Sequence, residues 1–497
     1  MKKLTIYFTS DTHGYLYPTN FADETPRAMG LFSMDFKKDG NTLVIDGGDC
    51  LQGAPLTYFC RQANRPMPVA RAMNELQYDY VTLGNHDFNY GYEVMRDHLG
   101  ALSARCLCAN LTDLGGELAF GDTAVRVMEN GLRVGLVGMV TSWVGVWEKS
   151  ENMEKLRVGD PFTAAKEACA ALRDQVDVLI GIYHGGFEKD VKTGRVLSET
   201  DENIGCKLCE ELPFDLLLTG HQHVPMENAN YCGTHVVQTP CNAVKYVKVT
   251  LEEDGTFSSA LAAPTAPARL KPWQASLFAE LNAWLDRPIG HISRVLLPGD
   301  KLDMALNGAP IADFYNMVQL DASGANVSCT CLGNELRGFV DRDVTVRDVV
   351  ASYTYSNTLV VLEITGAILK MALEQCATYF DTSGGTVGIA APFLLPKEAH
   401  YNYDFFYGIT YEFDLKNPIG SRVTKLMRSG KPVSGDDRMA LVMNNYRATG
   451  AGDFGFYQNC PRVKEMQTEV SELILNYLSA REMVEIPAFP SYRTVLP

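Results

Sequence analysis

Side chains that can bind a metal follow five separate apolar segments in the first half of the chain. They are Asp11, His13, Asp49, Asn85, His184, His221 and His223. Imidazole nitrogens combined with carboxylate oxygens suit Mn, Fe, Zn or Co better than Ca, which takes oxygen ligands. Because one tetrahedral ion needs only about four ligands, the set predicts two divalent ions that share a carboxylate.

Each of these signals is weak when it is taken alone. A short motif with an acid and a histidine arises by chance, and a single histidine is more often structural than a ligand. The five segments, however, all read as strands: LTIYFT, TLVIDGG, DYVTLG, DVLIGIYH and DLLLTGH. In open α/β sheets, ligands bind at the carboxyl ends of the strands. We therefore expect all seven side chains to meet at one edge of a sheet.

The elements that position these residues alternate along the first half of the chain. Apolar strand-like runs are separated by stretches with apolar residues at helical spacing, such as 161–176, which is typical of a layered α/β domain. A Pro/Ala-rich stretch and an amphipathic helix pattern from Trp273 to Leu285 then separate this half from the rest. We expect a layered α/β domain at 1–262, a linker helix at 263–289 and a second domain at 290–497.

Composition limits the classes of partner. The 497 residues carry a formal net charge of −16, and no run of Lys or Arg forms a basic patch, so a nucleic-acid polymer is a poor candidate partner. No apolar run approaches the ~18 residues of a membrane span, and the start of the chain has no signal-peptide core. Thirteen scattered cysteines fit reduced thiols better than a disulfide framework. These features predict a cytoplasmic protein without a membrane partner.

Two further patterns could carry chemistry but favour structural roles. Cys206 and Cys209 have CxxC spacing, yet no second pair and no thioredoxin-like context accompany them. We therefore expect buried thiols in a helix. The histidines outside the five segments are expected to be structural or exposed, and they are His98, His235, His291 and His400.

The motifs SDTHG, DGGD, GNHD, YHGG and TGHQH occur in this order, and with them the first half resembles the calcineurin-like metallophosphoesterases. The resemblance implies a four-layer β-sandwich flanked by helices. It divides the ligands into Asp11, His13 and His223 for one ion, Asn85, His184 and His221 for the other, and Asp49 as a bridge. Two ions ~3.5–4 Å apart can activate water and neutralise phosphoryl oxygens. His86 is the expected catalytic group, because it is placed to protonate the leaving oxygen.

The second half resembles the C-terminal α/β domain of the 5′-nucleotidase family, in segments such as YNYDFFYGITYEFDL and NNYRATGAGDFGFY. In that family two aromatic rings stack on the nucleoside base, and the matching motifs assign this role to Tyr403 and Tyr446. Stacking of a base on an aromatic ring is worth ~1–3 kcal/mol. The alternative is that one of these tyrosines is a core residue and Phe406 is the stacking ring.

Asn89 stands three residues after His86, where the 5′-nucleotidase branch of the family has an Asp. An amide can orient the imidazole but adds no negative charge. The sequence FNYG resembles instead the branch of 2′,3′-cyclic-nucleotide 2′-phosphodiesterase/3′-nucleotidases, whose usual motif is GNHEFNYG. Asp87 departs from the Glu of that motif, and Asn326 departs from the Asp of the family's GAD motif.

The resemblance therefore implies a two-metal hydrolase, with Mn, Zn, Fe or Co as the ions, that acts on nucleoside 2′,3′-cyclic phosphates and 3′-nucleotides. A 5′-nucleotidase or nucleotide-sugar hydrolase is the alternative among enzymes. The alternative that is not an enzyme is a nucleotide-binding protein that has the same fold but no catalytic activity. All seven expected ligands are present, which favours an enzyme.

Overall fold

The computed structural model describes residues 2–23, 25–148, 150–197, 200–265, 270–334, 336–355, 357–394, 398–487 and 492–497. The chain forms two compact units, and the first comprises Met1–Asn20 and Glu24–Leu281. The second comprises Phe21–Asp23 and Asn282–Pro497. Part of the expected Pro/Ala-rich linker, residues 266–269, lies outside the described residues. The division at 262 and 289 stays a prediction.

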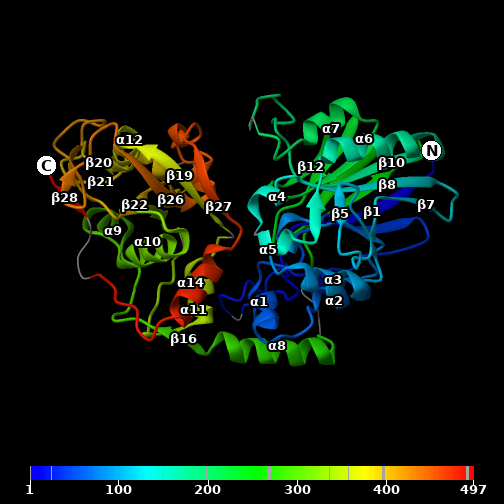
Figure 1. Ribbon diagram of the computed structural model, residues 1–497, viewed down its shortest axis with the longest axis horizontal. Helices are drawn as coiled ribbons and strands as arrows, with labels where there is room; N and C mark the ends of the chain where they lie inside the picture. The colour runs from blue at the N-terminus through cyan, green and yellow to red at the C-terminus, as the bar shows by residue number, and fades with distance from the viewer. Residues whose placement is uncertain are drawn as a thin grey trace. The chain divides into compact units, whose positions relative to one another are not determined.

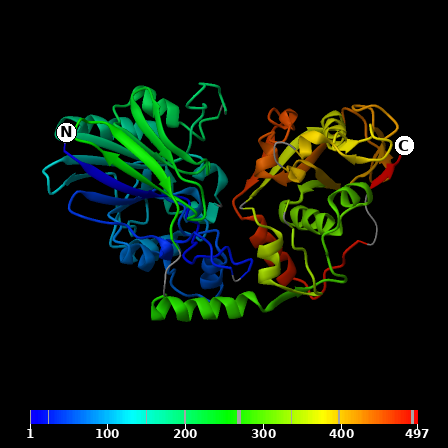
Figure 2. The same ribbon diagram turned by 180° about the vertical axis from the view of Figure 1, so that it is seen from behind.

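A seven-stranded sheet forms one half of the first unit. Its order is β15 (Phe257–Ala262), β14 (Tyr246–Leu251), β1 (Leu4–Thr9), β2 (Thr42–Asp46), β3 (Tyr80–Val81), β4 (Arg105–Leu107) and β6 (Phe120–Gly121). The strands from β1 to β6 in this order pair in parallel. β14 lies antiparallel to β1, and the two run side by side in Figure 2 although they are far apart in sequence.

A six-stranded sheet forms the other half. Its order is β12 (Met226–Tyr231), β13 (Thr234–Gln238), β11 (Leu216–Thr219), β10 (Val178–His184), β8 (Arg133–Val140) and β7 (Thr123–Val127). The four central strands pair in parallel, and the two edge strands are antiparallel to their neighbours. The ends of β10 and β11 therefore point the same way.

The two sheets pack face to face around one apolar core. Ile6 and Phe8 of β1 and Val249 of β14 share this core with Ile180 and Ile182 of β10. Because successive strand residues point to opposite faces, the intervening Leu179 and Tyr183 of β10 lie in a second core, on the outer face of the six-stranded sheet. A strand buried on both faces explains the continuous apolar run in the sequence.

Helices α6 (Pro161–Leu172) and α7 (Gly205–Glu211) cover that outer face (Figure 1). α6 begins where Asp160 caps the backbone N–H of Thr163 and Pro161 occupies the first turn. The other α-helices within this unit are α1 (Pro55–Gln62), α2 (Val69–Glu75), α3 (Tyr92–Ala101), α4 (Val144–Trp147) and α5 (Ser150–Met153). α8 (Pro272–Leu285) begins in this unit and ends in the second. A two-stranded sheet joins β5 (Leu111–Asp113) to β9 (Leu156–Val158). The expected sandwich flanked by helices is confirmed.

The second unit is also α/β. Its five-stranded sheet has the order β22 (Asp404–Tyr407), β17 (Val327–Cys331), β26 (Arg438–Asn444), β19 (Leu359–Thr365) and β27 (Arg462–Met466). A four-stranded sheet contains β25 (Lys431–Pro432), β24 (Val423–Arg428), β23 (Thr410–Asp414) and β28 (Tyr492–Val495). Pairs β16 (Pro288–His291) with β18 (Asp343–Thr345), and β20 (Phe380–Asp381) with β21 (Gly388–Ile389), complete the strands.

The helices of the second unit are α9 (Lys301–Asn307), α10 (Pro310–Ser323), α11 (Val346–Ser352), α12 (Gly366–Ala377), α13 (Asn445–Ala448) and α14 (Val470–Ser479). Capping side chains fix several of their starts. Thr345 and Asp348 cap α11 reciprocally, and Thr365 caps α12. Throughout the described ranges, every helix is too short or too polar to span a membrane.

Candidate metal centre

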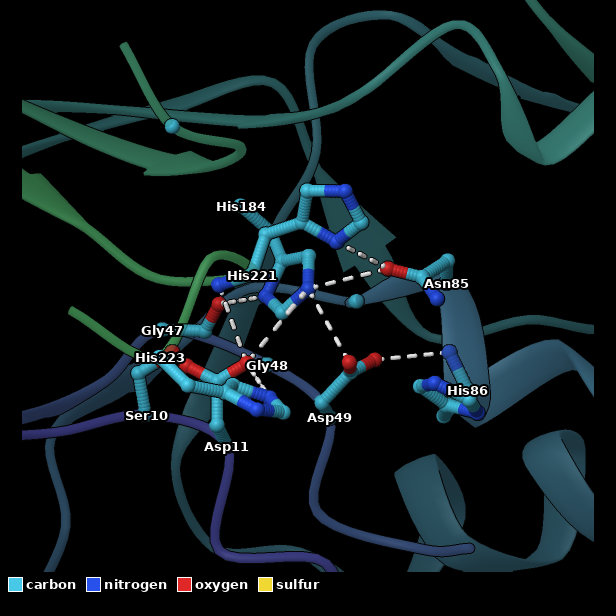
Figure 3. Close-up of polar contacts among 12 residues, drawn as sticks. Ser10, Asp11, Gly47, Gly48, Asp49, Asn85, His86, His184, His221 and His223 are labelled. Atoms are coloured by element: carbon cyan, nitrogen blue, oxygen red, sulfur yellow. Dashed lines mark hydrogen bonds and ion pairs between the residues drawn. The ribbon is translucent and has the colours of Figure 1, made fainter. Parts of the chain in front are cut away.

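The seven predicted ligands come from the ends of both sheets of the first unit, not from one edge of one sheet as the sequence suggested. β1, β2 and β3 of the seven-stranded sheet lead into Asp11 and His13, Asp49, and Asn85, whereas β10 and β11 of the six-stranded sheet supply the other three histidines. The two sheets meet at these ends, because His184 of β10 lies 3.1 Å from Asp49 after β2. In Figure 3 the side chains that turn toward one another are those of Asp11, Asp49, Asn85, His184, His221 and His223.

The backbone at the site is bent in an unusual way. Five of the seven predicted ligands have a positive φ, and they are Asp11 (55°), His13 (48°), Asp49 (57°), His221 (71°) and His223 (58°). Residues other than glycine rarely adopt this conformation, which costs about 1–3 kcal/mol and is often found at functional sites. Main-chain hydrogen bonds hold the bends, since Asp11 N donates to Gly48 O and His13 N donates to Asp49 O.

Glycines leave room for the two carboxylates. A Cβ atom on Gly220 would lie 2.6 Å from Oδ2 of Asp11, and one on Gly84 would lie 2.2 Å from Oδ1 of Asp49. Neither distance is possible for a real side chain without movement of the carboxylate. The glycines of GNH and TGH are therefore required by the close approach of these loops.

One group of possible ligands contains Asp11, His13 and His223. The Nε2 atoms of the two histidines lie 3.2 Å apart, and Nε2 of His223 lies 3.3 Å from Oδ1 of Asp11. All three ligand atoms lie within 4.8 Å of one another. Two imidazole lone pairs and a carboxylate facing one point are the donor set of a divalent transition metal.

A second group contains Asp11, Asp49 and His184. The amide oxygen of Asn85 adds to it, because this oxygen lies 3.2 Å from Nε2 of His184 and 2.8 Å from Nδ1 of His221. Asp11 thus belongs to both groups. The division of ligands between two ions, with Asp49 as the bridge, stays a prediction.

Hydrogen bonds on the far side of each ring decide which nitrogen faces the site. Nδ1 of His13 lies 2.8 Å from Gln52 O, and Nδ1 of His184 lies 2.7 Å from Gly47 O, so each ring keeps its Nε2 lone pair for a metal. His221 is turned around, since its Nε2 lies 2.9 Å from Glu202 Oε1 and its Nδ1 faces the site. The indole of Trp147 stacks on this ring.

The electrostatics of the site favour the binding of cations. Asp11 and Asp49 are fully buried. Oδ2 of Asp11 accepts no hydrogen bond from the described residues, and Oδ2 of Asp49 has the ring of His184 beside it, at 3.1 Å. Burial lowers the pKa of His13 to about 4, which keeps this ring neutral and able to donate a lone pair. Burial also opposes charge on His184, but the carboxylate of Asp49 outweighs it and raises the pKa to about 9. Cations that replace such protons fit this donor set.

His86 lies beside the two groups of possible ligands. Its backbone N–H donates to Oδ1 of Asp49 at 2.6 Å, and its ring lies 5.2 Å from that of His13. Nδ1 of His86 lies 2.8 Å from the amide oxygen of Asn89. The contact expected from the sequence, an amide that orients this imidazole, is therefore present.

The sequence reasoning assigned no role to three carboxylates that support the site. Asp87 accepts hydrogen bonds from the backbone N–H groups of Gly84, Asp49, Cys50 and Leu51, so it holds the Asp49 loop. Its place inside the GNHD motif was the available signal. Glu202 and Glu148 contact His221 and Asn89 from loops without any recognisable spacing. No sequence pattern could have found these two.

The tyrosines expected to stack on a base differ in exposure. Tyr403 is only 2% exposed, its hydroxyl donates to Ala305 O, and its ring packs against Tyr379 and Phe405. Tyr446 is 41% exposed, and the ring beside it is that of Tyr401, 6.3 Å away between centroids. Phe406 is 1% exposed. The pairing of Tyr403 with Tyr446 around a base stays a prediction, and Tyr401 is the better placed neighbour of Tyr446.

The remaining histidines and the CxxC pair lie apart from the site. Nε2 of His98 lies 3.5 Å from Cys50 Sγ, His235 contacts Ser259, His291 pairs with Asp343, and His400 contacts Tyr379. Cys206 and Cys209 lie within α7 and are buried in the outer core of the first unit. The structural or exposed roles expected for these residues stay a prediction.

Comparison with known proteins now identifies the family. The profile of the calcineurin-like phosphoesterases matches residues 4–225, and that of the 5′-nucleotidase C-terminal domain matches residues 288–458. A solved structure described as a putative 5′-nucleotidase from Staphylococcus aureus is 30% identical, with 99% of this chain and 100% of that chain covered and a TM-score of 0.75. The chain belongs to the 5′-nucleotidase family of calcineurin-like phosphoesterases.

Two curated relatives of this phosphoesterase are more distant. A 2′,3′-cyclic-nucleotide 2′-phosphodiesterase/3′-nucleotidase of Yersinia enterocolitica is 26% identical over 90% of this chain and 82% of its own length. A trifunctional nucleotide phosphoesterase of Bacillus subtilis is 23% identical over 97% of this chain, which spans only 38% of that protein. Calcineurin-like phosphoesterases use a dinuclear metal site, and this chain has two groups of Asp and His side chains that could hold a metal ion. The chain is therefore a metal-dependent phosphoesterase.

Proposed function

We propose that this phosphoesterase hydrolyses nucleoside 2′,3′-cyclic phosphates and 3′-nucleotides. The observation that carries the proposal is the contact of Asn89 Oδ1 with Nδ1 of His86, at 2.8 Å. An amide at this position resembles the FNYG motif of the cyclic phosphodiesterase/3′-nucleotidase branch. The Yersinia enterocolitica relative, whose name gives this activity, supports the same choice.

The metal-binding roles belong to this proposal as well. Asp11, His13 and His223 would hold one ion, Asn85, His184 and His221 the other, and Asp49 both. Two divalent cations, when bound, supply the Lewis acidity that activates water and neutralises the phosphoryl oxygens. Mn, Zn, Fe and Co all suit the mixed nitrogen and oxygen donors.

The side chains of the enzyme itself carry out orientation and proton transfer. With Nδ1–H held by Asn89, the imidazolium form of His86 carries a second proton on Nε2 and donates this proton as the general acid. In the first reaction, water attacks the phosphorus of the cyclic diester, the bond to O2′ breaks, and O2′ takes a proton. In the second, water attacks the 3′-phosphate, the bond to O3′ breaks, and O3′ takes a proton to leave nucleoside and orthophosphate.

The same ribose edge presents both ester bonds. A base stacked on an aromatic ring, for which Tyr446 is the candidate, fixes the sugar, and the cyclic phosphate and the 3′-phosphate occupy the same edge of that sugar. A 5′-phosphate leaves from the other side of the sugar. A single site can therefore catalyse both reactions and discriminate against 5′-nucleotides.

A panel of 2′,3′-cyclic AMP, 3′-AMP and 5′-AMP, each with Mn, Zn, Co and Mg, tests the proposal. We expect transient 3′-AMP followed by adenosine from the cyclic substrate, and a markedly lower kcat/KM for 5′-AMP. Faster hydrolysis of 5′-AMP would favour 5′-nucleotidase activity, for which the Staphylococcus aureus structure described as a putative 5′-nucleotidase argues. Absence of hydrolysis and of bound metal would favour the non-catalytic alternative.

A further inference from the structure

A chain of polar contacts leads from His86 away from the metal ligands. Nδ1 of His86 contacts Oδ1 of Asn89, and Nδ2 of Asn89 donates to Oε2 of Glu148 at 2.6 Å. Glu148 follows directly after α4 and is partly buried. A carboxylate is thus present near the imidazole after all, one amide farther away than a direct His–Asp pair would place it.

Glu148 decides which way the amide of Asn89 points. An ionised carboxylate can only accept hydrogen bonds, so the NH₂ end of Asn89 must face Glu148 and the oxygen must face His86. An amide oxygen in turn can only accept, so Nδ1 of His86 must carry the proton. Without the carboxylate, the amide could rotate by half a turn, and His86 could adopt the other tautomer.

A second amide holds the carboxylate itself. Nδ2 of Asn152, on α5, donates to Oε1 of Glu148 at 2.9 Å and also approaches the backbone oxygen of Asn89 at 3.4 Å. The two oxygens of Glu148 therefore each meet an amide donor. Because Asn152 also contacts the main chain of residue 89, it ties the α4–α5 segment to the loop that carries His86.

We propose that Glu148 is a positioning residue that acts through Asn89 to fix the tautomer and orientation of His86. The inference rests on the proposed function of His86 as the acid that protonates the leaving oxygen. Removing Glu148 should slow reactions that need this proton and spare those that do not. Its effect should fall on kcat rather than on KM, because Glu148 reaches His86 through Asn89 and acts on the proton transfer.

The first test compares leaving groups in Glu148→Ala, with the neighbouring exposed Glu151→Ala as a control for the loss of one negative charge. On the best nucleotide substrate we expect kcat to fall by ~10–100-fold, within the ~10²–10⁴-fold that a general acid contributes in full. On a p-nitrophenyl phosphoester, whose phenolate leaves without a proton, the loss should be less than about 3-fold. His86→Ala should show the same selectivity with a larger loss.

The second test is a rescue. Asn89→Asp alone brings two carboxylates together at a distance suited to a hydrogen bond, so it should lower activity by like-charge repulsion. Combined with Glu148→Ala, the same substitution places a carboxylate directly on Nδ1 of His86 and should restore most of kcat. The double variant should therefore be more active than either single variant. Independent losses that multiply would overturn the proposal, because they would indicate a merely structural Glu148.

A spectroscopic measurement completes the design. In protein labelled with ¹⁵N at histidine and loaded with Zn, the neutral form of His86, which remains after Nε2 has given up its proton, should be protonated on Nδ1, and Glu148→Gln should yield a mixture of tautomers. An unchanged His86 tautomer together with equal losses on both leaving groups would overturn the inference. If 5′-AMP is the best substrate, the proposed function fails, but the leaving-group comparison made with 5′-AMP still supports or overturns the role of Glu148.

Discussion

Nε2 of His184 lies 3.1 Å from Oδ2 of Asp49, and the opposite nitrogen of the same ring lies 2.7 Å from the carbonyl oxygen of Gly47. The carbonyl can only accept, so Nδ1 carries a proton and Nε2 faces the carboxylate. Two groups rich in electrons thus face each other in a fully buried place. Either a proton or a metal ion must lie between them, and the charge of Asp49 is central to both cases.

Asp49→Asn keeps the volume of the side chain and removes this charge. We expect weaker binding of both ions and a loss of hydrolysis greater than the ~10–100-fold typical for removing a hydrogen-bond partner of a ligand. Metal analysis of the purified protein and turnover with 3′-AMP measure the effect, and Asp122→Asn on the exposed surface is the control. Two tightly bound ions with near-normal turnover would contradict the assignment of Asp49.

Gly220→Ala tests the close approach of the loops. The new methyl group would lie 2.2 Å from Ser10 Oγ and 2.6 Å from Asp11 Oδ2, so Asp11 must move. We expect metal affinity and activity to fall, together with a loss of stability of about 1–3 kcal/mol from overpacking. Gly100→Ala in α3 is the matched control, because its Cβ meets no atom within 4 Å. The free energy of unfolding of that control, measured by denaturant titration, should increase by about 0.5–1 kcal/mol.

Tyr446→Ala separates binding from chemistry. If its half-exposed ring stacks on the base, KM for nucleotides should rise by about 5- to 150-fold, which corresponds to ~1–3 kcal/mol. A small phosphodiester without a base should be hydrolysed as before. Tyr401→Ala should behave in the same way if it forms the other face of the clamp, whereas Tyr355→Ala, 43% exposed in the same unit, should not. Equal losses on both substrates would assign Tyr446 to the fold.

Asp46 at the end of β2 gives a pH dependence of stability. Burial raises its pKa to about 8, while Oγ1 of Thr9 donates to it at 2.5 Å. Between its ordinary pKa of ~4 and this value, the folded protein keeps a proton that the unfolded chain releases. Stability must therefore fall as the pH rises through this window and level off above about pH 8.

Asp46→Asn imitates the protonated carboxyl and should remove this decline. In metal-free protein, we expect the free energy of unfolding of the variant to rise relative to that of the native chain by up to ~1.4 kcal/mol per pH unit between pH 5 and 7. Urea unfolding at several pH values measures the difference, with the exposed Asp174→Asn as the control. Parallel pH profiles for Asp46→Asn and the native chain would show that Asp46 is ionised in the fold.

The sequence alone determined the kinds of donor at the site and the elements that carry them. Each donor group lies at or just past the carboxyl end of an apolar strand, and both signals are local: a strand is recognised by its apolar run, and its end by the polar residues that follow. The same local pattern predicted a layered α/β domain in the first half, whereas the resemblance to known families implied the sandwich and the α/β character of the second unit. The order of the motifs was then enough to indicate the family.

Only the tertiary structure decided how these parts meet. β10 and β11 belong to a different sheet from β1, β2 and β3. This division depends on pairing between strands that are distant in sequence, and such pairing leaves no local pattern. The burial of Tyr403, compared with the exposure of Tyr446, likewise depends on packing against Tyr379. The carboxylates of Glu202 and Glu148 reach His221 and Asn89 from loops, where spacing carries no information and only the folded path of the chain brings the partners together.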